Sequence, residues 1–269
     1  IRALRHMLRC HAVAYQVIKE TYPGAEVGLA KHFRPVEAWP PGNVLNRWWA
    51  GRISRFFNDQ WLEALINGRL HLPIGRGSDK NLANTLDFIG VNYYSRSLVR
   101  FPPRPGGLYE PRVPDGAVTT EDQFFELYPQ GLFKALKACL GYGLPLYITE
   151  NGLPDSSDRQ RPAFIMNHLR EVWRAINFNY PIMGYYHWSL VDNFEWDRGW
   201  TQRFGLVEMD PETQERIWRP SARLYQEICR DKCISSDQAE RYAPEILDTL
   251  FPGKAPEPIE CAGQDEMFL

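Results

Sequence analysis

Helix-like and strand-like patterns of apolar residues alternate along the chain. Apolar positions recur at helical spacing in five segments: residues 1–20, 43–69, 129–143, 161–178 and 221–230. Short runs of β-forming residues with little alternation occupy four others: residues 25–33, 86–95, 145–149 and 182–188. Proline and glycine punctuate the segments, as at Pro23–Gly24 and Gly68. The pattern predicts four strands, each followed by a helix, and the strand in residues 86–95 is expected to be covered on both faces.

Repeated βα units predict a parallel sheet, which is either an open doubly wound sheet or a (β/α)8 barrel. An open sheet often carries a glycine-rich phosphate loop at one switch point, and the segment GRGS at residues 75–78 precedes no such strand–helix turn. Instead, every predicted strand ends in polar or aromatic residues: Lys31 and His32, Asn92 and Tyr94, Glu150 and Asn151, His187 and Trp188. Barrel enzymes place their chemistry at these strand ends, so the pattern favours a TIM barrel.

The remaining segments are predicted to be loops and turns. Residues 96–118 form a long loop rich in proline, glycine and arginine, and residues 203–219 form a hairpin around Asp210 and Pro211. The main domain is expected to span residues 1–230. Residues 231–269 are expected to form a surface extension with one short helix over residues 239–251.

Composition narrows the possible partners. The chain has 269 residues, 44% of them hydrophobic, and a formal net charge of -2. This charge gives no reason to expect nucleic acid or an anionic membrane as a partner, and it favours neutral substrates. No run approaches the roughly 18 apolar residues of a membrane span, and residues 1–20 lack the apolar core of a secretory signal.

The five cysteines are odd in number, and Cys10, Cys139 and Cys229 lie in predicted helices as small apolar residues. Cys229 and Cys233 could approach each other on a helix, but a zinc site needs further ligands. We therefore expect no metal and no cofactor. A reducing compartment, and hence a cytoplasmic location, is the expectation.

Glu150 stands where an apolar strand emerges into a loop, in the segment LPLYITENGLPDSS at residues 144–157. In a barrel, a glutamate at this position points into the mouth of the active site, where it can act as nucleophile, acid or base. The alternative is that Glu150 caps the next helix or pairs with an arginine.

Aromatic and acidic residues mix in HWSLVDNFEWDRGWTQRFG, residues 187–205. Trp188, Trp196 and Trp200 alternate there with Asp192 and Glu195. Carbohydrate sites use this mixture, because a pyranose offers an apolar face to a ring and hydroxyl groups to carboxylates. The alternative is that the tryptophans are core residues and the acids are solvated.

These motifs resemble those of the glycoside hydrolase family 1 β-glucosidases and β-galactosidases. YITENG resembles the nucleophile motif on the seventh barrel strand, GVNYYS the sixth-strand motif, and WSLVDNFEWDRGWTQRFGLV the eighth-strand signature. RPSARLYQEI resembles the closing helix. The resemblance runs from residue 1 to about residue 230 in family order. It implies a retaining glycosidase with a (β/α)8 fold, of which this chain holds the last four βα units, strands five to eight.

The resemblance also implies roles for individual residues. Glu150 would be the catalytic nucleophile, Tyr94 would hydrogen-bond its carboxylate, and Asn92 would line the same pocket. Three further residues would recognise the sugar: Trp188 as the floor beneath it, Glu195 at O4 and O6, and Trp196 on the O3 side. Phe204 would help to close the far wall.

The second catalytic carboxyl group has no counterpart. Retaining glycosidases need two carboxyl groups about 5–5.5 Å apart, and the family carries the acid/base in an Asn-Glu-Pro motif on the fourth strand, which does not occur here. The sugar-binding glutamine of the first strand and histidine of the third also lack counterparts. Glu37, in the loop after the first strand, is the one glutamate with a plausible reach. We expect instead that the acid/base lies in an absent N-terminal half, since the sequence begins inside a helix.

Two classes of function remain open. The chain is either part of a β-glycosidase, inactive alone and completed by the missing half, which could be a separate chain, or a non-catalytic truncated paralogue that binds sugar or a partner. An upstream reading frame encoding Asn-Glu-Pro would distinguish them. The segment DNFEWDRGW lacks the residues of family members that cleave 6-phosphosugars, so unphosphorylated β-glycosides are the expected substrates. The preference among glucosides, galactosides and fucosides stays open.

Overall fold

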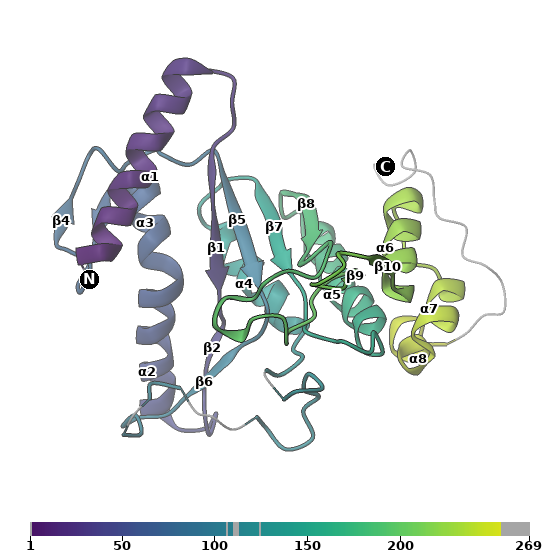
Figure 1. Ribbon diagram of the computed structural model, residues 1–269. Coiled ribbons are helices and arrows are strands. Elements are labelled where there is room, and N and C mark those ends of the chain that lie inside the picture. The colour runs from purple at the N-terminus through teal and green to yellow at the C-terminus, as the bar shows by residue number, and fades with distance from the viewer. Residues whose placement is uncertain (1, 106, 110–112, 124, 254–269) are drawn as a thin grey trace, which may run out of the picture. The chain divides into compact units, whose positions relative to one another are not determined.

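The main sheet of the structure has four parallel strands (Figure 1). The computed structural model describes residues 2–105, 107–109, 113–123 and 125–253. The four strands lie side by side in chain order: β1 (Gly28–Phe33), β5 (Phe88–Tyr93), β7 (Leu146–Asn151) and β8 (Ile182–His187). The four parallel strands predicted from the sequence are confirmed.

Helices follow the strands as the periodicity predicts. Their bounds are α1 (Arg2–Thr21), α2 (Val44–Ser54), α3 (Gln60–Asn67), α4 (Gln130–Leu140), α5 (Arg161–Asn177) and α6 (Pro220–Asp231). The helix predicted over residues 43–69 is confirmed from Val44 to Asn67, and within it a π-helical turn, η1 (Arg55–Asp59), joins α2 to α3. Within η1, the side chain of Asn58 bonds the backbone of Arg34 rather than solvent, accepting from its N–H at 3.0 Å and donating to its carbonyl at 2.9 Å.

The two faces of the sheet are covered unequally. On β5, Ile89, Val91 and Tyr93 are fully buried on the face where α4 packs. Asn92 points to the other face and is half-buried. The prediction that the strand in residues 86–95 is covered on both faces is therefore correct for the face that α4 covers and only partly correct for the face that carries Asn92.

Short strand pairs lie outside the main sheet. They are β2 (Val36–Ala38) with β6 (Ser97–Val99), β3 (Arg69–Leu70) with β4 (Gly77–Ser78), and β9 (Val207–Met209) with β10 (Arg216–Trp218). The last pair is the predicted hairpin, and at its turn the Asp210 carboxylate accepts from the N–H groups of Glu212 and Thr213 at 2.8 Å. The first two pairs were not predicted, because strands of two or three residues leave little periodicity to detect.

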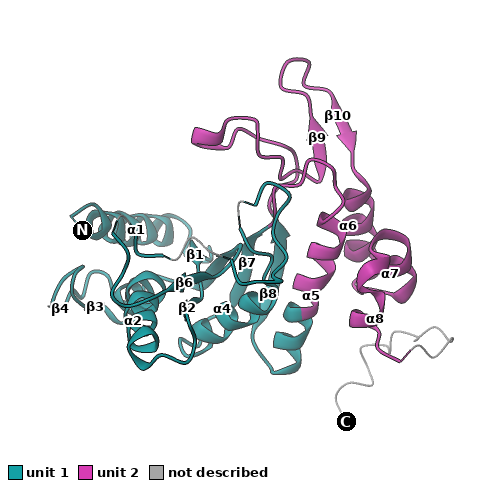
Figure 2. Cartoon of the chain, turned by 90° about the horizontal axis from the view of Figure 1, so that it is seen from below, with its two compact units in different colours: residues 1–151, 171–187 teal, residues 152–170, 188–269 magenta. Residues whose placement is uncertain are grey.

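The chain divides into two compact units (Figure 2). Unit 1 comprises residues 1–151 and 171–187, and unit 2 comprises residues 152–170 and 188–269. In unit 2, the segment predicted as one short helix forms α7 (Ser236–Tyr242), a 3-10 turn and α8 (Leu247–Leu250). The rest of the predicted extension, residues 254–269, lies outside the described residues, and the domain boundary at residue 230 stays a prediction.

Candidate active site

Glu150 lies at the C-terminal end of β7, in unit 1. In the pairing of β5 with β7, Glu150 is opposite Asn92, and in the pairing of β1 with β5, Asn92 is opposite His32. Paired residues of parallel strands share a level and a face of the sheet. His32, Asn92 and Glu150 therefore form one row across the C-terminal ends of three strands.

Tyr94 contacts the carboxylate of Glu150 directly. Its hydroxyl group donates a hydrogen bond of 2.6 Å to Glu150 Oε2. The Tyr94 ring is held edge-on by His32, with centroids 5.9 Å apart, and by Phe125, at 6.3 Å. A hydroxyl donor stabilises the ionised form of a carboxylate, which is the form that can attack as a nucleophile.

Further polar groups around Glu150 were not predicted as site residues. Thr149 Oγ1 donates to Asn92 Oδ1 at 2.5 Å. Asn151 is fully buried, and its side chain donates to the Tyr93 carbonyl and accepts from the Tyr185 hydroxyl group, both at 2.8 Å. The polar residues on either side of Glu150 therefore brace the end of β7 against β5 and β8.

Lys31 and His32 lie near the end of β1, and burial lowers the pKa of both side chains. Burial, followed by the charges of Arg34 and Lys31, lowers the pKa of His32 to about 4, so its ring is neutral at physiological pH. Burial also lowers the pKa of Lys31 to about 8. The Lys31 ammonium group lies 4.6 Å and 4.7 Å from the ring centroids of Phe33 and Phe57 and donates to the His32 carbonyl at 2.7 Å.

In unit 2, the structure brings Trp188 and Glu195 together. The indole Nε1 of Trp188 donates a 3.2 Å hydrogen bond to Glu195 Oε1. Trp196 is 84% exposed, whereas Phe204 is buried. The predicted site residues thus form two groups: Asn92, Tyr94 and Glu150 in unit 1, and Trp188, Glu195, Trp196 and Phe204 in unit 2.

Gly152, the glycine of the TENG motif, lies where no side chain fits. A Cβ atom on this residue would lie 1.8 Å from the carbonyl oxygen of Trp188, also in unit 2. Since a contact this short with backbone cannot be relieved by a side-chain rotation, only glycine fits at this close approach of two backbones.

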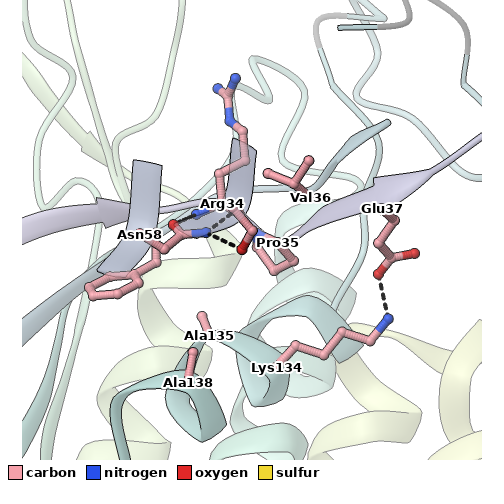
Figure 3. Close-up of a pocket in the computed structure, with 10 residues that line it drawn as sticks. Arg34, Pro35, Val36, Glu37, Asn58, Lys134, Ala135 and Ala138 are labelled. Carbon is pink, nitrogen blue, oxygen red and sulfur yellow. Dashed lines mark hydrogen bonds and ion pairs between the residues drawn. The ribbon is translucent and has the colours of Figure 1, made fainter. Parts of the chain in front are cut away.

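Glu37 is engaged in ion pairs beside a pocket of about 330 Å³ (Figure 3). Its carboxylate bonds Arg96 at 2.7 Å and also pairs with Lys134, toward which it points in the close-up. Burial by itself would raise the pKa of Glu37, but the hydrogen bonds and charges of Lys134 and Arg96 outweigh it and lower the pKa. A catalytic acid needs a pKa near the working pH, so this environment disfavours Glu37 in that role.

Arg96 links Glu37 to a wider charged cluster in unit 1. It also pairs with Glu126 through two 2.8 Å hydrogen bonds and stacks over the Tyr128 ring at 4.0 Å. The cluster therefore ties the loop between β5 and α4 to β2.

Metal and membrane features can be assessed for the described ranges. Among these residues, no group of three or more histidine, cysteine and acidic side chains could hold a metal ion. None of the helices in the same ranges is long and apolar enough to cross a bilayer.

The cysteines predicted to lie in helices differ in exposure. Cys139 is buried, while Cys10 and Cys229 are exposed thiols.

Comparison with known proteins identifies the family. Residues 1–234 match the glycosyl hydrolase family 1 model. The chain is 36% identical over 256 residues to a β-galactosidase of Saccharolobus solfataricus, covering 88% of this chain and 49% of that protein. It is 31% identical over 257 residues to β-glucosidase A of Thermotoga maritima, covering 86% and 56%.

The fold agrees with the sequence comparison. The structure of a β-glycosidase from Pyrococcus horikoshii superposes with a TM-score of 0.77 at 35% identity, covering 89% of this chain and 55% of that one. The chain therefore belongs to glycosyl hydrolase family 1, and it has an α/β fold matching the TIM barrels of that family over about half their length. It also spans about half the length of the curated relatives it matches.

Proposed function

We propose that this chain is part of a retaining β-glycosidase that hydrolyses terminal unphosphorylated β-D-glucosides or related β-glycosides through a glycosyl-enzyme intermediate on Glu150. The observation that carries the proposal is the Glu150 carboxylate at the end of β7, with the Tyr94 hydroxyl group 2.6 Å away. A nucleophile of this class must be directed toward the anomeric carbon, and the Tyr94 hydrogen bond fixes the orientation of the Glu150 carboxylate.

The other residues take supporting roles in the proposal. Asn92, beside Glu150 in the sheet, lines the nucleophile's pocket. Glu195, held by Trp188, accepts from the sugar's O4 and O6 hydroxyl groups, which suits a carboxylate with two acceptor oxygens. Trp188 forms the floor beneath the sugar, Trp196 contacts its O3 side, and Phe204 supports the far wall.

The acid/base carboxyl group is proposed to lie outside this chain, on the first half of the barrel, with this chain holding strands five to eight. Retaining hydrolysis needs a second carboxyl group about 5–5.5 Å from the first. Glu37 is committed to Arg96 and Lys134, which supports a different origin for that group.

The surface of unit 1 supports a complementary half as partner. Among the described strands, β1 and β8 are the two edges of the sheet, each paired on one side. Large apolar side chains are exposed on α1, at Met7, Val13 and Val17, and on the edge strand β8, at Met183 and Tyr186. Exposed sheet edges and apolar surface of this kind promote association.

A trapping experiment tests the nucleophile. The 269-residue chain, assembled with a family 1 half supplying strands one to four, is treated with a 2-fluoro β-glucoside that forms a stable glycosyl-enzyme. Peptide mass spectrometry should locate the label on Glu150, and Glu150→Gln should take none. Glu20→Gln, at an exposed glutamate, is the matched control and should label normally. A label on another carboxylate refutes the assignment.

A complementation experiment tests the missing acid/base. Hydrolysis of cellobiose and of an aryl β-glucoside is measured for the chain with and without the other half. The chain alone should show at most one slow burst on the aryl glucoside, because no group then activates water to release the intermediate. Sustained cellobiose hydrolysis by the chain alone contradicts the proposal. An assembled protein that binds sugar but never forms the intermediate would instead be the non-catalytic paralogue.

A further inference from the structure

The segment that carries Glu195 and Trp196 has little regular structure of its own. Between Asn193 and Gln202, the secondary structure is one 3-10 turn, Trp196–Arg198. Backbone hydrogen bonds such as Glu195 N–H to the Gly199 carbonyl, at 2.8 Å, shape the turn internally. We call residues 193–202 the sugar loop. Its internal hydrogen bonds do not by themselves orient it relative to the rest of unit 2.

A buried ion pair holds the residue that enters the sugar loop. Asp192 is buried, and both of its carboxylate oxygens accept from the Arg219 guanidinium, at 3.2 Å and 3.1 Å. Arg219 also donates to the Gly205 carbonyl at 2.6 Å, and Asp192 accepts from the Gly205 N–H at 2.8 Å. Arg219, the N-cap residue of α6, therefore holds the chain on both sides of the sugar loop, at Asp192 before it and at Gly205 after it.

A second buried arginine holds the end of the loop. Arg161 opens α5 and is fully buried, and it donates to the Arg203 carbonyl at 2.8 Å. The same carbonyl accepts from the Asp155 N–H at 3.0 Å. Arg161 also pairs with Asp158.

Asp158 joins the two arginine centres within unit 2. It accepts from the Ser221 N–H at 2.8 Å and from the Ser221 hydroxyl group at 2.6 Å. Ser221 lies two residues after Arg219 at the start of α6. The N-terminal turns of α5 and α6 thus form one buried polar network that reaches both ends of the sugar loop.

We infer that Arg219 and Arg161 are positioning residues that set the orientation of Glu195 by holding the two ends of the sugar loop. The inference rests on the proposed function of Glu195 in sugar recognition. Burying an ion pair contributes little stability compared with apolar residues of the same volume, so this network is better explained by the geometry it specifies. A planar guanidinium holds both oxygens of a carboxylate and a carbonyl in one fixed plane, whereas the ammonium group of lysine is a single point of charge without this bidentate fork.

The first test needs no activity. Trypsin cleaves after Arg198, inside the sugar loop, and after Arg76, an exposed site in unit 1 that serves as the internal reference. In the 269-residue chain, Arg219→Met should raise cleavage at Arg198 relative to Arg76 by about tenfold, because local opening of the loop becomes easier. Arg223→Met, at an exposed arginine of α6, is the matched control and should change the ratio by less than about twofold.

The second test asks whether Arg219 acts through Glu195. In the assembled enzyme, Arg219→Met should lower kcat/KM by about thirtyfold when Glu195 is present, but by less than about threefold in the Glu195→Ala background, because coupled residues are not additive. When Glu195 is present, Arg219→Lys should lower kcat/KM by less than Arg219→Met does. In the Glu195→Ala background, the two variants should have the same kcat/KM. Equal losses in both backgrounds, or unchanged cleavage at Arg198, overturn the inference.

Folding controls keep the test decisive. Cooperative unfolding of each variant is measured first, and if Arg219→Met does not fold, Arg219→Lys is carried through the same two measurements with smaller expected changes. If both variants fail to fold, the network maintains unit 2 as a whole, and the loop-specific role is refuted. If the assembled enzyme cleaves no glycoside, the proposed function fails, whereas the protease ratio still decides whether Arg219 holds the loop.

Discussion

Glu150 and Glu195 are held in place by different kinds of structure. Glu150 lies at the end of a strand in the middle of a parallel sheet, where backbone pairing with Asn92 sets its position and Tyr94 adds one hydrogen bond. Glu195 lies on an irregular loop whose ends are tied down by the buried charges of Asp192 and Arg219. A sheet positions a side chain through its backbone register, so it needs few special contacts. A loop must obtain the same precision from side chains.

The largest predicted effect comes from breaking the loop's recognition group. Glu195→Ala should lower kcat/KM of the assembled enzyme by about three orders of magnitude, or about 4 kcal/mol, because hydroxyl contacts strengthen as the ring distorts in the transition state. Steady-state kinetics measure the loss, and circular dichroism checks that the fold survives. Glu215→Ala, at an exposed glutamate of the β9–β10 hairpin, is the control. A loss below about tenfold would mean that Glu195 only supports structure.

The strand end should be less sensitive to loss of a single neighbour. Tyr94→Phe should lower kcat/KM by about 10–100-fold, since a hydrogen bond to a charged group contributes about 1.5–3 kcal/mol. The backbone register that places Glu150 is unaffected. Tyr22→Phe, at an exposed tyrosine after α1, should leave the rate unchanged. An effect of Tyr94→Phe as large as that of Glu195→Ala would show that the sheet alone does not orient the nucleophile.

Lys31 and Arg219 are both buried cations, but they differ in their partners. Arg219 pairs with Asp192, whereas Lys31 has no carboxylate at ion-pair distance among the described residues. Burial lowers its pKa from 10.5 to about 8, so the unfolded chain binds more protons between these pH values. The contribution of Lys31 to the free energy of unfolding should therefore rise as the pH increases from about 8 to about 10.5. Denaturant titrations of the parent chain and of Lys31→Met across this range isolate this contribution as the difference between the two.

Replacing Lys31 should remove this pH dependence. Lys31→Met should increase the free energy of unfolding near pH 7 by about 1–3 kcal/mol, because it eliminates a buried charge whose depressed pKa opposes folding. Lys80→Met, at an exposed lysine, provides the control. If Lys31→Met is destabilising, the contacts of the ammonium group with the rings of Phe33 and Phe57 outweigh its burial.

The smallest effect is expected at Glu37. Its ion pairs with Arg96 and Lys134 hold loops of unit 1, so Glu37→Gln should change kcat/KM of the assembled enzyme by less than about tenfold. Azide rescue of a Glu37→Ala variant provides a second measurement, since small anions replace a missing catalytic carboxylate. A loss of about three orders of magnitude with rescue would make Glu37 the acid/base and remove the need for a second half.

Local sequence patterns were sufficient for much of the fold. The four parallel strands and the hairpin around Asp210 could be predicted because apolar periodicity and turn residues act over a few neighbouring positions. The same patterns missed the π-helical turn at Arg55–Asp59, where the side chain of Asn58 bonds the backbone of Arg34, 24 residues earlier. A local pattern cannot show a contact over that separation. Strands β2 and β6 were missed because each is too short to show a period.

Some features of the candidate site could also be predicted from the sequence, and others could not. Glu150 was identifiable as a polar residue that ends an apolar strand, and the ordered motifs were enough to recognise the family. The amino-acid order could not reveal that Arg161 and Arg219, 58 positions apart, share one buried network through Asp158 and Ser221. Nor could it reveal that Glu37 is engaged by Lys134, 97 residues further on. Such pairings depend on the sheet register and on which helices pack together, so they exist only once distant segments have been folded into contact.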